Sequence, residues 1–236
     1  MAADYAQYRP DYPRAAVEWA LRPVVGGQRV RLLDLGAGTG KLTAALLEFG
    51  EVMAVEPDEG MLDELRSRFP DAEAHVGTAE QIPADDSSID AVLVGQAWHW
   101  FDRDRALAEC ARVLRSGGVL AVLWNNEDRR VDWVPGFWDA LHWDRRIPLA
   151  EDGVPTLPGH PAFALSEHSL HPNPVRTTTE ALLRSVATQS WILVAEPERR
   201  EHILGRARDY LAARPETSSG EFELPLVTDV LRALRK

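Results

Sequence analysis

The feature that most constrains this chain is a glycine-rich turn between a short apolar strand and a helix. Residues 29–35, RVRLLDL, read as a strand, and the run from Asp34 to Gly40 that follows carries Gly36, Gly38 and Gly40. Glycine lets a backbone turn sharply and approach a ligand without a Cβ in the way. By itself, the same run also fits a tight strand-to-helix turn that binds nothing.

The segments after this turn alternate between apolar strands and amphipathic helices. We expect strands at 51–57, 72–77, 89–95 and 119–124, and helices at 41–50, 59–69 and 103–115. Gly50 is expected to end the first of these helices in the left-handed conformation. Such alternation indicates βαβ units and a doubly wound, mainly parallel α/β sheet that is covered on both faces.

We expect a single domain over residues 1–236. It would comprise an N-terminal lid and helix (1–28), a cofactor-binding core (29–124), a cap with helices (125–220) and a terminal strand (221–236). Apolar spacing predicts cap helices over 177–190 and 197–214. Pro225 argues that the terminal strand lies at a sheet edge or carries a bulge, because proline cannot donate to a sheet ladder.

The composition of the chain limits the substrates and partners that we expect. The net charge is −11, and no block of five basic residues offers a cationic face for phosphates, so a nucleic-acid substrate is disfavoured. No apolar run approaches the roughly 20 residues of a membrane span, and the N-terminus lacks the apolar core of a secretory signal. The single cysteine, Cys110, excludes an internal disulfide and a cysteine-rich zinc site. We therefore expect a cytoplasmic protein that acts on a small molecule, without a membrane partner.

An acidic residue further along the chain narrows the ligand. Glu56 closes the second expected strand, 20 residues after Gly36, where the ribose hydroxyls of a nucleoside cofactor would lie. A dinucleotide-binding turn has the spacing G-x-G-x-x-G, whereas this chain has G-x-G-x-G with Asp34 two residues ahead. The alternative of an NAD-dependent oxidoreductase is disfavoured by this spacing.

An acid followed by alternating glycines resembles the first motif of the class I S-adenosylmethionine-dependent methyltransferases. The resemblance continues through Glu56 as the ribose-binding acid, residues 77–83 as the adenine-binding loop and residues 89–101 as the fourth strand and its loop. It is closest to the type-11 methyltransferases, and among them to proteins similar to trans-aconitate methyltransferase. The similarity to this last group is based on Tyr8–Pro13 and Gln96–Phe101.

The resemblance implies a Rossmann-like, seven-stranded sheet with one antiparallel strand, S-adenosylmethionine as cofactor, no metal, and a monomer or homodimer. Thr78 stands where the family often has Asp, so we expect the polar adenine contact from the Ala79 backbone and Glu80. Tyr8 and Arg9 belong to the expected lid, for which an ordinary N-terminal arm is the alternative. The implied cofactor contacts are Tyr8, Arg9, Asp34, Gly36, Ala37, Gly38, Gly40, Lys41, Glu56, Pro57, Met61, Thr78, Ala79, Glu80, Gln96 and Ala97.

The loop after the fourth strand is expected to face the transferred methyl, because ligands of open α/β sheets lie beyond the carboxyl ends of the strands. His99 is the titratable residue of this loop and the candidate catalytic base, although it could equally only pack among its aromatic neighbours. We expect Trp98, Trp100, Tyr12 and Trp124 to contact the acceptor. At two-residue spacing, the first two could instead point one inward and one outward.

Tryptophans are concentrated in one part of the chain and predict an aromatic-walled cavity over one end of the sheet. They are Trp98, Trp100, Trp124, Trp133, Trp138 and Trp143. The methyl of a sulfonium is already activated, so we expect the chain mainly to align a nucleophile rather than to carry a catalytic triad. The predicted function is methyl transfer to an O, N or C atom of a small molecule; the further alternative is a cofactor-binding protein with a regulatory role.

Overall fold

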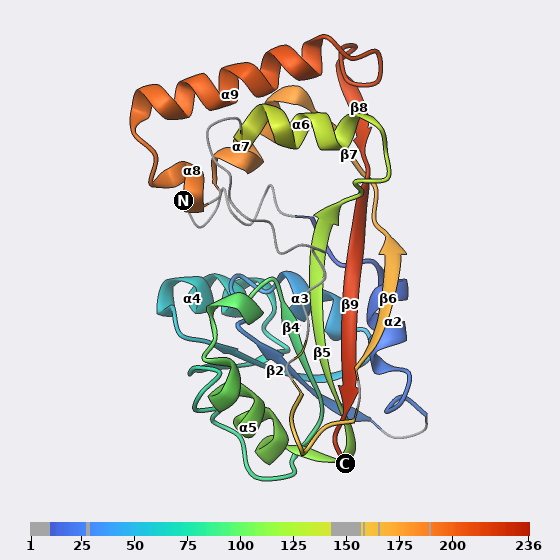
Figure 1. Ribbon diagram of the computed structural model, residues 1–236. Helices are drawn as coiled ribbons and strands as arrows, with labels where there is room; N and C mark the ends of the chain where they lie inside the picture. Colours follow the sequence, from blue (N-terminus) through green and yellow to red (C-terminus); the bar gives the residue numbers. More distant parts are fainter. Residues whose placement is uncertain (1–9, 27–28, 143–156, 158, 165, 189) are drawn as a thin grey trace.

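The computed structural model describes residues 10–26, 29–142, 157, 159–164, 166–188 and 190–236 (Figure 1). The chain forms a lower lobe around a large sheet and an upper lobe of helices, which we call the cap. The elements of the first half are α2 (Arg14–Leu21), β1 (Val30–Leu35), α3 (Lys41–Leu46), β2 (Gly50–Glu56), α4 (Glu59–Arg68), β3 (Glu73–Val76), β4 (Ile89–Gly95), the 3₁₀ turn η1 (Trp98–Trp100) and α5 (Arg103–Val113).

The second half completes the sheet and builds the cap. Its elements are β5 (Leu114–Glu127), α6 (Trp133–His142), β6 (Glu167–Pro172), β7 (Val175–Thr178), α7 (Thr179–Ala187), α8 (Ser190–Leu193), α9 (Pro197–Ala212), β8 (Glu221–Leu224) and β9 (Leu226–Leu234). The seven strands of the main sheet lie in the order β3-β2-β1-β4-β5-β9-β6. Strand β9 runs antiparallel to both of its neighbours, and the other pairs are parallel. The predicted Rossmann-like, mainly parallel sheet is confirmed.

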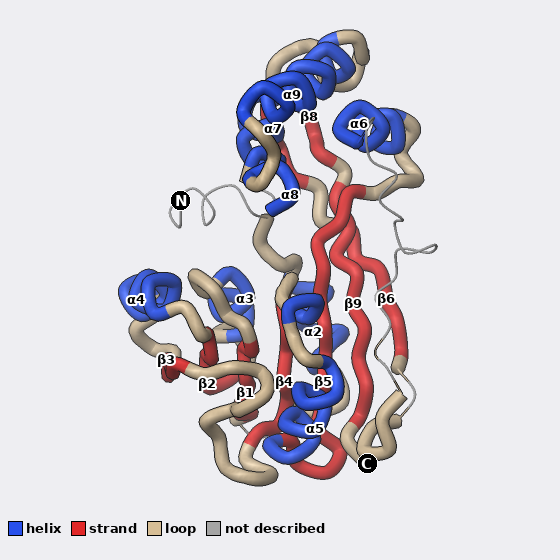
Figure 2. Tube along the Cα trace, turned by 60° about the vertical axis from the view of Figure 1, so that its left-hand side comes forward, coloured by secondary structure: helices blue, strands red, loops and turns tan. Residues whose placement is uncertain are grey.

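Helices cover both faces of this sheet, as Figure 2 shows. Successive side chains of a strand point to opposite faces. In β1, Leu32 therefore packs in the core beneath α2 and α3, whereas Leu33 packs in the core that contains the buried side of α5. Both leucines are completely buried. Such two-sided burial, worth about 2–3 kcal/mol for each large aliphatic side chain, explains why the inner strands β1 and β4 are mostly apolar.

Gly50 has a different role from the one expected. It does not adopt a positive φ but begins β2, and α3 ends earlier, at Leu46. A Cβ at position 50 would lie 2.2 Å from the carbonyl oxygen of Val30 on β1. The glycine is needed here because two neighbouring backbones approach closely, not because a helix ends.

The cap stands at the carboxyl ends of the parallel strands and is tied to the sheet by two long strands. β5 and β9 run from the lower lobe into the upper one, and their pairing extends as far as Glu127 and Leu226 (Figure 1). The cap has its own core, formed mainly by α6, α7 and α9, with Phe137, Leu183 and Ala207 buried in it.

The second half differs from the sequence-based expectation of cap and helices over 125–220. β5 continues three residues beyond Trp124, and β6 adds an edge strand to the main sheet. The residues of β6, EHSLHP, are partly exposed and carry no apolar run, so pattern alone does not reveal them. The tail contains two strands separated by Pro225: β8 pairs with β7, and β9 lies inside the main sheet rather than at its edge.

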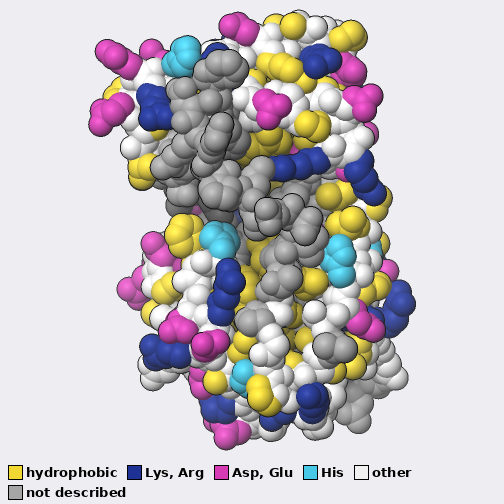
Figure 3. Space-filling model, viewed as in Figure 1, with side chains coloured by type: hydrophobic (Ala, Val, Ile, Leu, Met, Phe, Trp, Pro, Cys, Tyr) yellow, Lys and Arg dark blue, Asp and Glu magenta, His cyan; other side chains and the backbone are white. Residues whose placement is uncertain are grey.

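Acidic and basic side chains are interspersed on the face of the molecule shown in Figure 3. Among the described residues, no helix has the length and apolarity that crossing a membrane requires. Cys110 lies on the buried face of α5, packed against the sheet, as its place in an apolar pattern predicts.

Candidate functional site

The glycine turn lies where the carboxyl ends of β1, β2 and β4 meet. Its three glycines have φ values between +55° and +87°, a region that side chains disfavour. The N–H groups of Gly36 and Ala37 donate to the carbonyl oxygen of Val55, at 2.8 and 3.1 Å. A Cβ at Gly36 would lie 2.7 Å from the Cβ of Ala97. The turn is therefore fixed to β2 on one side and packed against the loop after β4 on the other.

Two buried carboxyl groups lie under this turn. Asp34 accepts a hydrogen bond of 2.6 Å from the hydroxyl of Thr43, and its other carboxylate oxygen has no partner among the described residues. Glu56 accepts hydrogen bonds from the N–H groups of Gly38, at 2.9 Å, and Asp58, at 3.1 Å. Burial raises the pKa of Asp34 to about 7; hydrogen bonds from Thr43 oppose the rise and the charge of Glu56 adds to it.

Asn125, just beyond the end of the apolar part of β5, joins several elements of the site. Its side-chain oxygen accepts hydrogen bonds from Asn173, at 3.1 Å, and from the hydroxyl of Thr228 on β9. Its backbone oxygen accepts a hydrogen bond of 3.0 Å from the side chain of Gln96. Gln96 has a φ of +58°, unusual for a residue with a side chain, and its N–H donates to the carbonyl oxygen of Leu123.

The same asparagines hold the N-terminal segment over the sheet. Asn125 donates to the carbonyl oxygens of Pro10 and Asp11, both at 3.3 Å, and Asn173 donates to that of Asp11 at 2.8 Å. The carboxylate of Asp11 forms a 2.7 Å ion pair with the ammonium of Lys41, the first residue of α3. Residues 10–12 therefore cross above the glycine turn.

Two pockets meet beneath this segment. The first, which we call the turn pocket, is lined by Pro10, Tyr12, Asp34, Gly36, Ala37, Gly38, Thr39, Lys41, Leu42, Gly95, Gln96 and Asn125. The second, which we call the cap cavity, has a volume of about 610 Å³ and lies between the sheet and the cap. Both are lined by Pro10, Lys41, Gln96 and Asn125, so the two pockets adjoin at these four residues.

Comparisons with known proteins agree with this geometry. Residues 33–122, which contain the glycine turn and β4, match a family described as a methyltransferase domain. Over 236 aligned residues the chain is 42% identical to an uncharacterized methyltransferase of Mycobacterium tuberculosis (strain ATCC 25618 / H37Rv), covering 97% of this chain and 91% of that protein. This chain belongs to the class I S-adenosylmethionine-dependent methyltransferases.

Two further proteins extend the likeness of this methyltransferase. An uncharacterized methyltransferase of Schizosaccharomyces pombe is 36% identical over 203 residues, 84% of this chain and 80% of that one. A solved structure described as a type II methyltransferase, from Anaeromyxobacter dehalogenans, superposes with a TM-score of 0.76 at 29% identity, covering 97% of this chain and 98% of that chain. The likeness therefore includes the cap as well as the sheet.

The cofactor of this methyltransferase is S-adenosylmethionine, and the turn pocket has the chemistry to receive it. The unpartnered oxygen of Asp34 and the buried acid Glu56 suit a ligand that brings hydrogen-bond donors and a positive charge. At Gly38, where a Cβ would meet only the Met61 sulfur at 4.0 Å, the backbone of the turn is left open. Both features are what a sulfonium-containing nucleoside would require.

The structure brings most of the predicted cofactor residues together around the turn. Pro57 and Met61 follow Glu56 at the beginning of α4, and the Met61 sulfur lies 4.0 Å from where a Cβ of Gly38 would be. In the loop after β3, Thr78 forms a bridge with Gln81. Tyr8 and Arg9 lie outside the described residues, so their predicted contacts stay predictions.

The two residues that follow Thr78 both contact other parts of the protein. Ala79 is buried in the core. The Glu80 carboxylate accepts a hydrogen bond of 2.9 Å from the N–H of Asp102, the N-cap of α5. The predicted adenine contact from Glu80 would therefore come from a side chain that also accepts a hydrogen bond from the N-cap residue of α5.

The aromatic loop after β4 is divided between the inside and the outside of the molecule. Trp98 is 1% exposed and belongs to the core, whereas Trp100 is 70% exposed. His99 is exposed on η1, with its ring 4.8 Å from that of Trp100. Of the two orientations left open by the sequence, the structure shows the one in which these tryptophans point opposite ways. His99 is not among the residues that line either pocket.

The tryptophans of the described part of the chain do not gather around the turn pocket or the cap cavity. Trp98 and Trp124 pack in the core of the sheet, and Trp133 packs in the core of the cap. None of the described tryptophans lines the turn pocket or the cap cavity. Closeness in sequence misleads here because the side chains leave different elements in different directions. Trp143 lies outside the described residues. Tyr12, by contrast, lines the turn pocket, and its hydroxyl would touch a Cβ at Gly95.

Sequence reasoning missed Asn125 and Asn173. Asn125 could have been found, because a polar residue directly after an apolar strand lies at the edge where ligands bind. Asn173 follows β6, which the sequence does not reveal. Within the described residues, no group of three or more His, Cys, Asp or Glu side chains has an arrangement that could hold a metal ion.

Proposed function

We propose that this methyltransferase transfers the methyl group to a small molecule bound in the cap cavity. The observation that carries the proposal is that the cap cavity adjoins the turn pocket at Pro10, Lys41, Gln96 and Asn125. A donor in one pocket and an acceptor in the other would meet at these residues. The volume of about 610 Å³ falls within the range of about 300–1,000 Å³ typical of ligand pockets.

We further propose how the cofactor lies. The ribose hydroxyls would hydrogen-bond to Glu56 at the end of β2, and adenine would lie against residues 77–83. The methionine part would lie along the glycine turn towards Lys41 and Gln96. This placement is supported by the shared edge of the sheet, since β1, β2 and β4 end side by side there. It leaves the sulfur near the boundary between the two pockets.

The cap cavity has a polar floor and a partly apolar roof. The floor comes from the sheet lobe and includes the side chains of Lys41, Gln96 and Asn125. The roof includes one side of α7, where Ala181, Leu182, Ser185 and Val186 recur at helical spacing. An acceptor that fits both would place a polar, methyl-accepting end at the floor and an apolar body against α7.

The cofactor, when bound, supplies a methyl group on a positively charged sulfur that is already a good leaving group. The residues of this chain then have to align the acceptor and exclude water. Alignment can contribute about 7–11 kcal/mol in well-oriented reactions. Asn125 and Asn173 serve it by tying residues 10 and 11 over the boundary, which closes the site from above.

A base is needed only where the acceptor atom carries a proton that it must lose. A carboxylate acceptor needs none, whereas a hydroxyl does. His99 is our candidate base only for an acceptor that reaches the exposed side of η1, because it does not line the cap cavity. The transfer to an O, N or C atom is thus proposed with Gln96 and Asn125 nearest to the reacting end.

The test is methyl transfer from a labelled cofactor into a whole-cell extract, whose small molecules and macromolecules are separated before the label is measured. We expect a labelled product with the unaltered protein and loss of most turnover with Ala181→Trp, whose ring would fill the cavity beneath α7. Glu180→Trp adds the same ring on the exposed side of the same helix, where only a surface ion pair with Arg208 is lost. It should retain turnover.

Binding of S-adenosylhomocysteine, measured by calorimetry, separates the two pockets. Both tryptophan variants should bind it as the unaltered protein does, because neither changes the turn pocket. Unchanged turnover in Ala181→Trp would remove the acceptor from the cap cavity. Labelling of a macromolecule, with no labelled small molecule, would contradict the proposed substrate class.

A further inference from the structure

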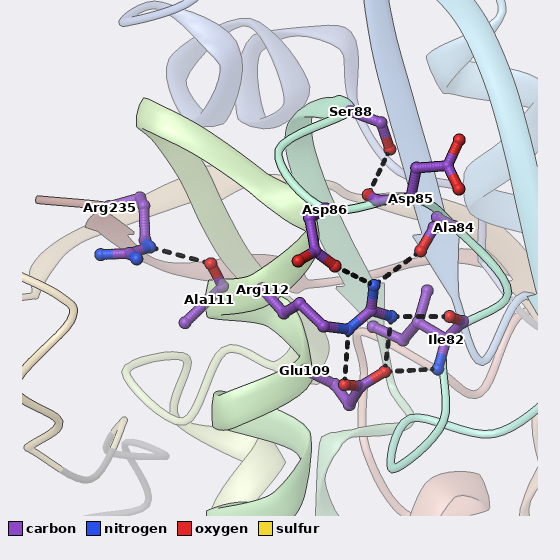
Figure 4. A network of polar contacts seen from close by, with 9 residues as sticks. All are labelled: Ile82, Ala84, Asp85, Asp86, Ser88, Glu109, Ala111, Arg112 and Arg235. Atoms are coloured by element: carbon purple, nitrogen blue, oxygen red, sulfur yellow. Dashed lines mark hydrogen bonds and ion pairs between the residues drawn. The ribbon is translucent and has the colours of Figure 1, made fainter.

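Helix α5 holds the loop that follows β3 at several points. Figure 4 shows the main contact, in which the guanidinium of Arg112 faces the loop backbone. It donates to the carbonyl oxygens of Ile82, at 2.9 Å, and Ala84, at 2.8 Å, and to the carboxylate of Asp86, at 2.8 Å. One side chain therefore binds three alternate residues of the loop.

Glu109, one turn earlier on α5, completes the contact. Its carboxylate accepts a 2.9 Å hydrogen bond from the N–H of Ile82 and two 2.8 Å hydrogen bonds from Arg112. Ile82 is thus held through both its N–H and its carbonyl group (Figure 4). The hydrogen bonds from Arg112 lower the pKa of Glu109, so the carboxylate stays ionised at neutral pH.

The beginning of α5 holds the same loop from its other end. The N–H of Asp102 donates to Glu80, and the Asp102 carboxylate caps the helix by accepting from the N–H of Arg105. Helix α5 therefore contacts the loop at Glu80 and again at Ile82. Ala79, next to the first contact, and Ile82, at the second, are both buried in the core of the sheet.

We propose that Arg112 and Glu109 are positioning residues that set the backbone of residues 78–82 and thereby the recognition of the cofactor's base. The inference rests on the proposed placement of adenine against residues 77–83. Both side chains contact the loop directly, at Ile82 and, for Arg112, also at Ala84 and Asp86, so they would act on the base through the loop. We expect the backbone of Ala79 to contact the base. A backbone group can discriminate one base from another only when its position is fixed.

The alternative is that the contact only stabilises the fold. Arg112 is partly exposed, 32% for its side chain, and exposed ion pairs contribute little stability. Its carbonyl partners are what distinguish it from an ordinary surface pair, because they belong to the loop backbone. A positioning role predicts a change in base discrimination, whereas a stabilising role predicts only a lower melting temperature.

The experiment measures the Kd of S-adenosylhomocysteine and of S-inosylhomocysteine, in which a carbonyl group replaces the 6-amino group of the base. We expect the unaltered protein to prefer the adenosyl compound. In Arg112→Ala, the Kd of S-adenosylhomocysteine should rise about tenfold. This rise corresponds to the loss of about one charge-assisted hydrogen bond that holds the loop in its binding conformation. The Kd of the inosyl compound should rise less, so the preference narrows.

Arg115→Ala is the matched control. Arg115 donates to the carbonyl oxygens of Ser87 and Ser88 and to the carboxylate of Asp90, so it binds the far end of the same loop. Its removal changes the charge equally and should leave the preference unchanged. Glu109→Gln keeps a side-chain oxygen for the N–H of Ile82 and should retain more of the preference than Glu109→Ala.

Three outcomes would overturn the proposal. The first is an unaltered preference in a folded Arg112→Ala variant, and the second is an equal loss in Arg115→Ala. The third is an unaltered protein that binds both compounds equally, which would show that the loop does not read the base. The acceptor plays no part in this binding measurement, so failure of the cap-cavity proposal would leave the result unaffected.

Discussion

The buried acid under the glycine turn makes stability depend on pH in an unusual direction. Asp34 is 1% exposed, and burial raises its pKa from 3.8 to about 7. The fold therefore favours the protonated form of this group. The stability that it contributes is fully present below pH 4 and is lost as the pH rises through 7.

The magnitude follows from the size of the shift. About three pKa units, at about 1.4 kcal/mol each, correspond to about 4 kcal/mol over the whole range. Between pH 5 and pH 8, about 3 kcal/mol of this change in the free energy of unfolding should appear. Asp34→Asn removes the titration but keeps an oxygen that can accept the hydrogen bond from Thr43.

The assay is urea unfolding of the cofactor-free protein and the Asp34→Asn variant at several pH values. All other titrating groups are common to both proteins, so the difference between their unfolding free energies isolates Asp34. We expect the variant to gain about 3 kcal/mol relative to the unaltered protein from pH 5 to pH 8. If the unfolding free energies of the two proteins changed in parallel with pH, the reasoning would be refuted. If the variant instead lost stability relative to the unaltered protein as the pH rises, the fold would be shown to stabilise the carboxylate form of Asp34.

Three further predictions concern the same edge of the sheet. Glu56→Ala should lose most of the thermal stabilisation by S-adenosylhomocysteine, which is about 2.7 kcal/mol at 100 times the Kd; an undiminished shift would remove Glu56 from the site. Gly36→Ala should cost at least about 2 kcal/mol in urea unfolding, because its Cβ would clash with that of Ala97 at a positive φ; a loss below 0.5 kcal/mol would contradict the packing seen here. At Gln96, whose φ is +58°, Val should be about 2 kcal/mol less stable than Gly, and equal stabilities would argue against the left-handed backbone.

The sequence alone was enough to predict the sheet lobe and the donor. β1, β2, β4 and the middle of β5 carry apolar runs, because an inner strand of a parallel sheet is buried on both faces and tolerates few polar residues, whereas the edge strand β3 is partly exposed. The glycine turn could be read because a positive φ and a close backbone approach leave little choice of residue. With Glu56 at the end of the next strand, these local constraints pointed to a nucleoside cofactor.

The acceptor side depends on residues that have no local signature. β6 is a partly exposed edge strand, so it carries no apolar run, and Asn173 behind it could not be placed. Asn125 draws its importance from partners such as Thr228, 103 residues away, which only the pairing of β5 with β9 brings near.

Side-chain direction also required the tertiary structure. Trp98 and Trp100 are two residues apart in a similar setting, yet one is buried in the core and the other is largely exposed. Which way each points follows from the path of the chain into η1 and α5. The sequence by itself thus determined the parallel strands of the sheet and the methyl donor, because both depend on neighbouring residues. Only the tertiary structure formed the cap cavity, where we propose that the acceptor binds, because that cavity is assembled from segments between residue 10 and residue 226.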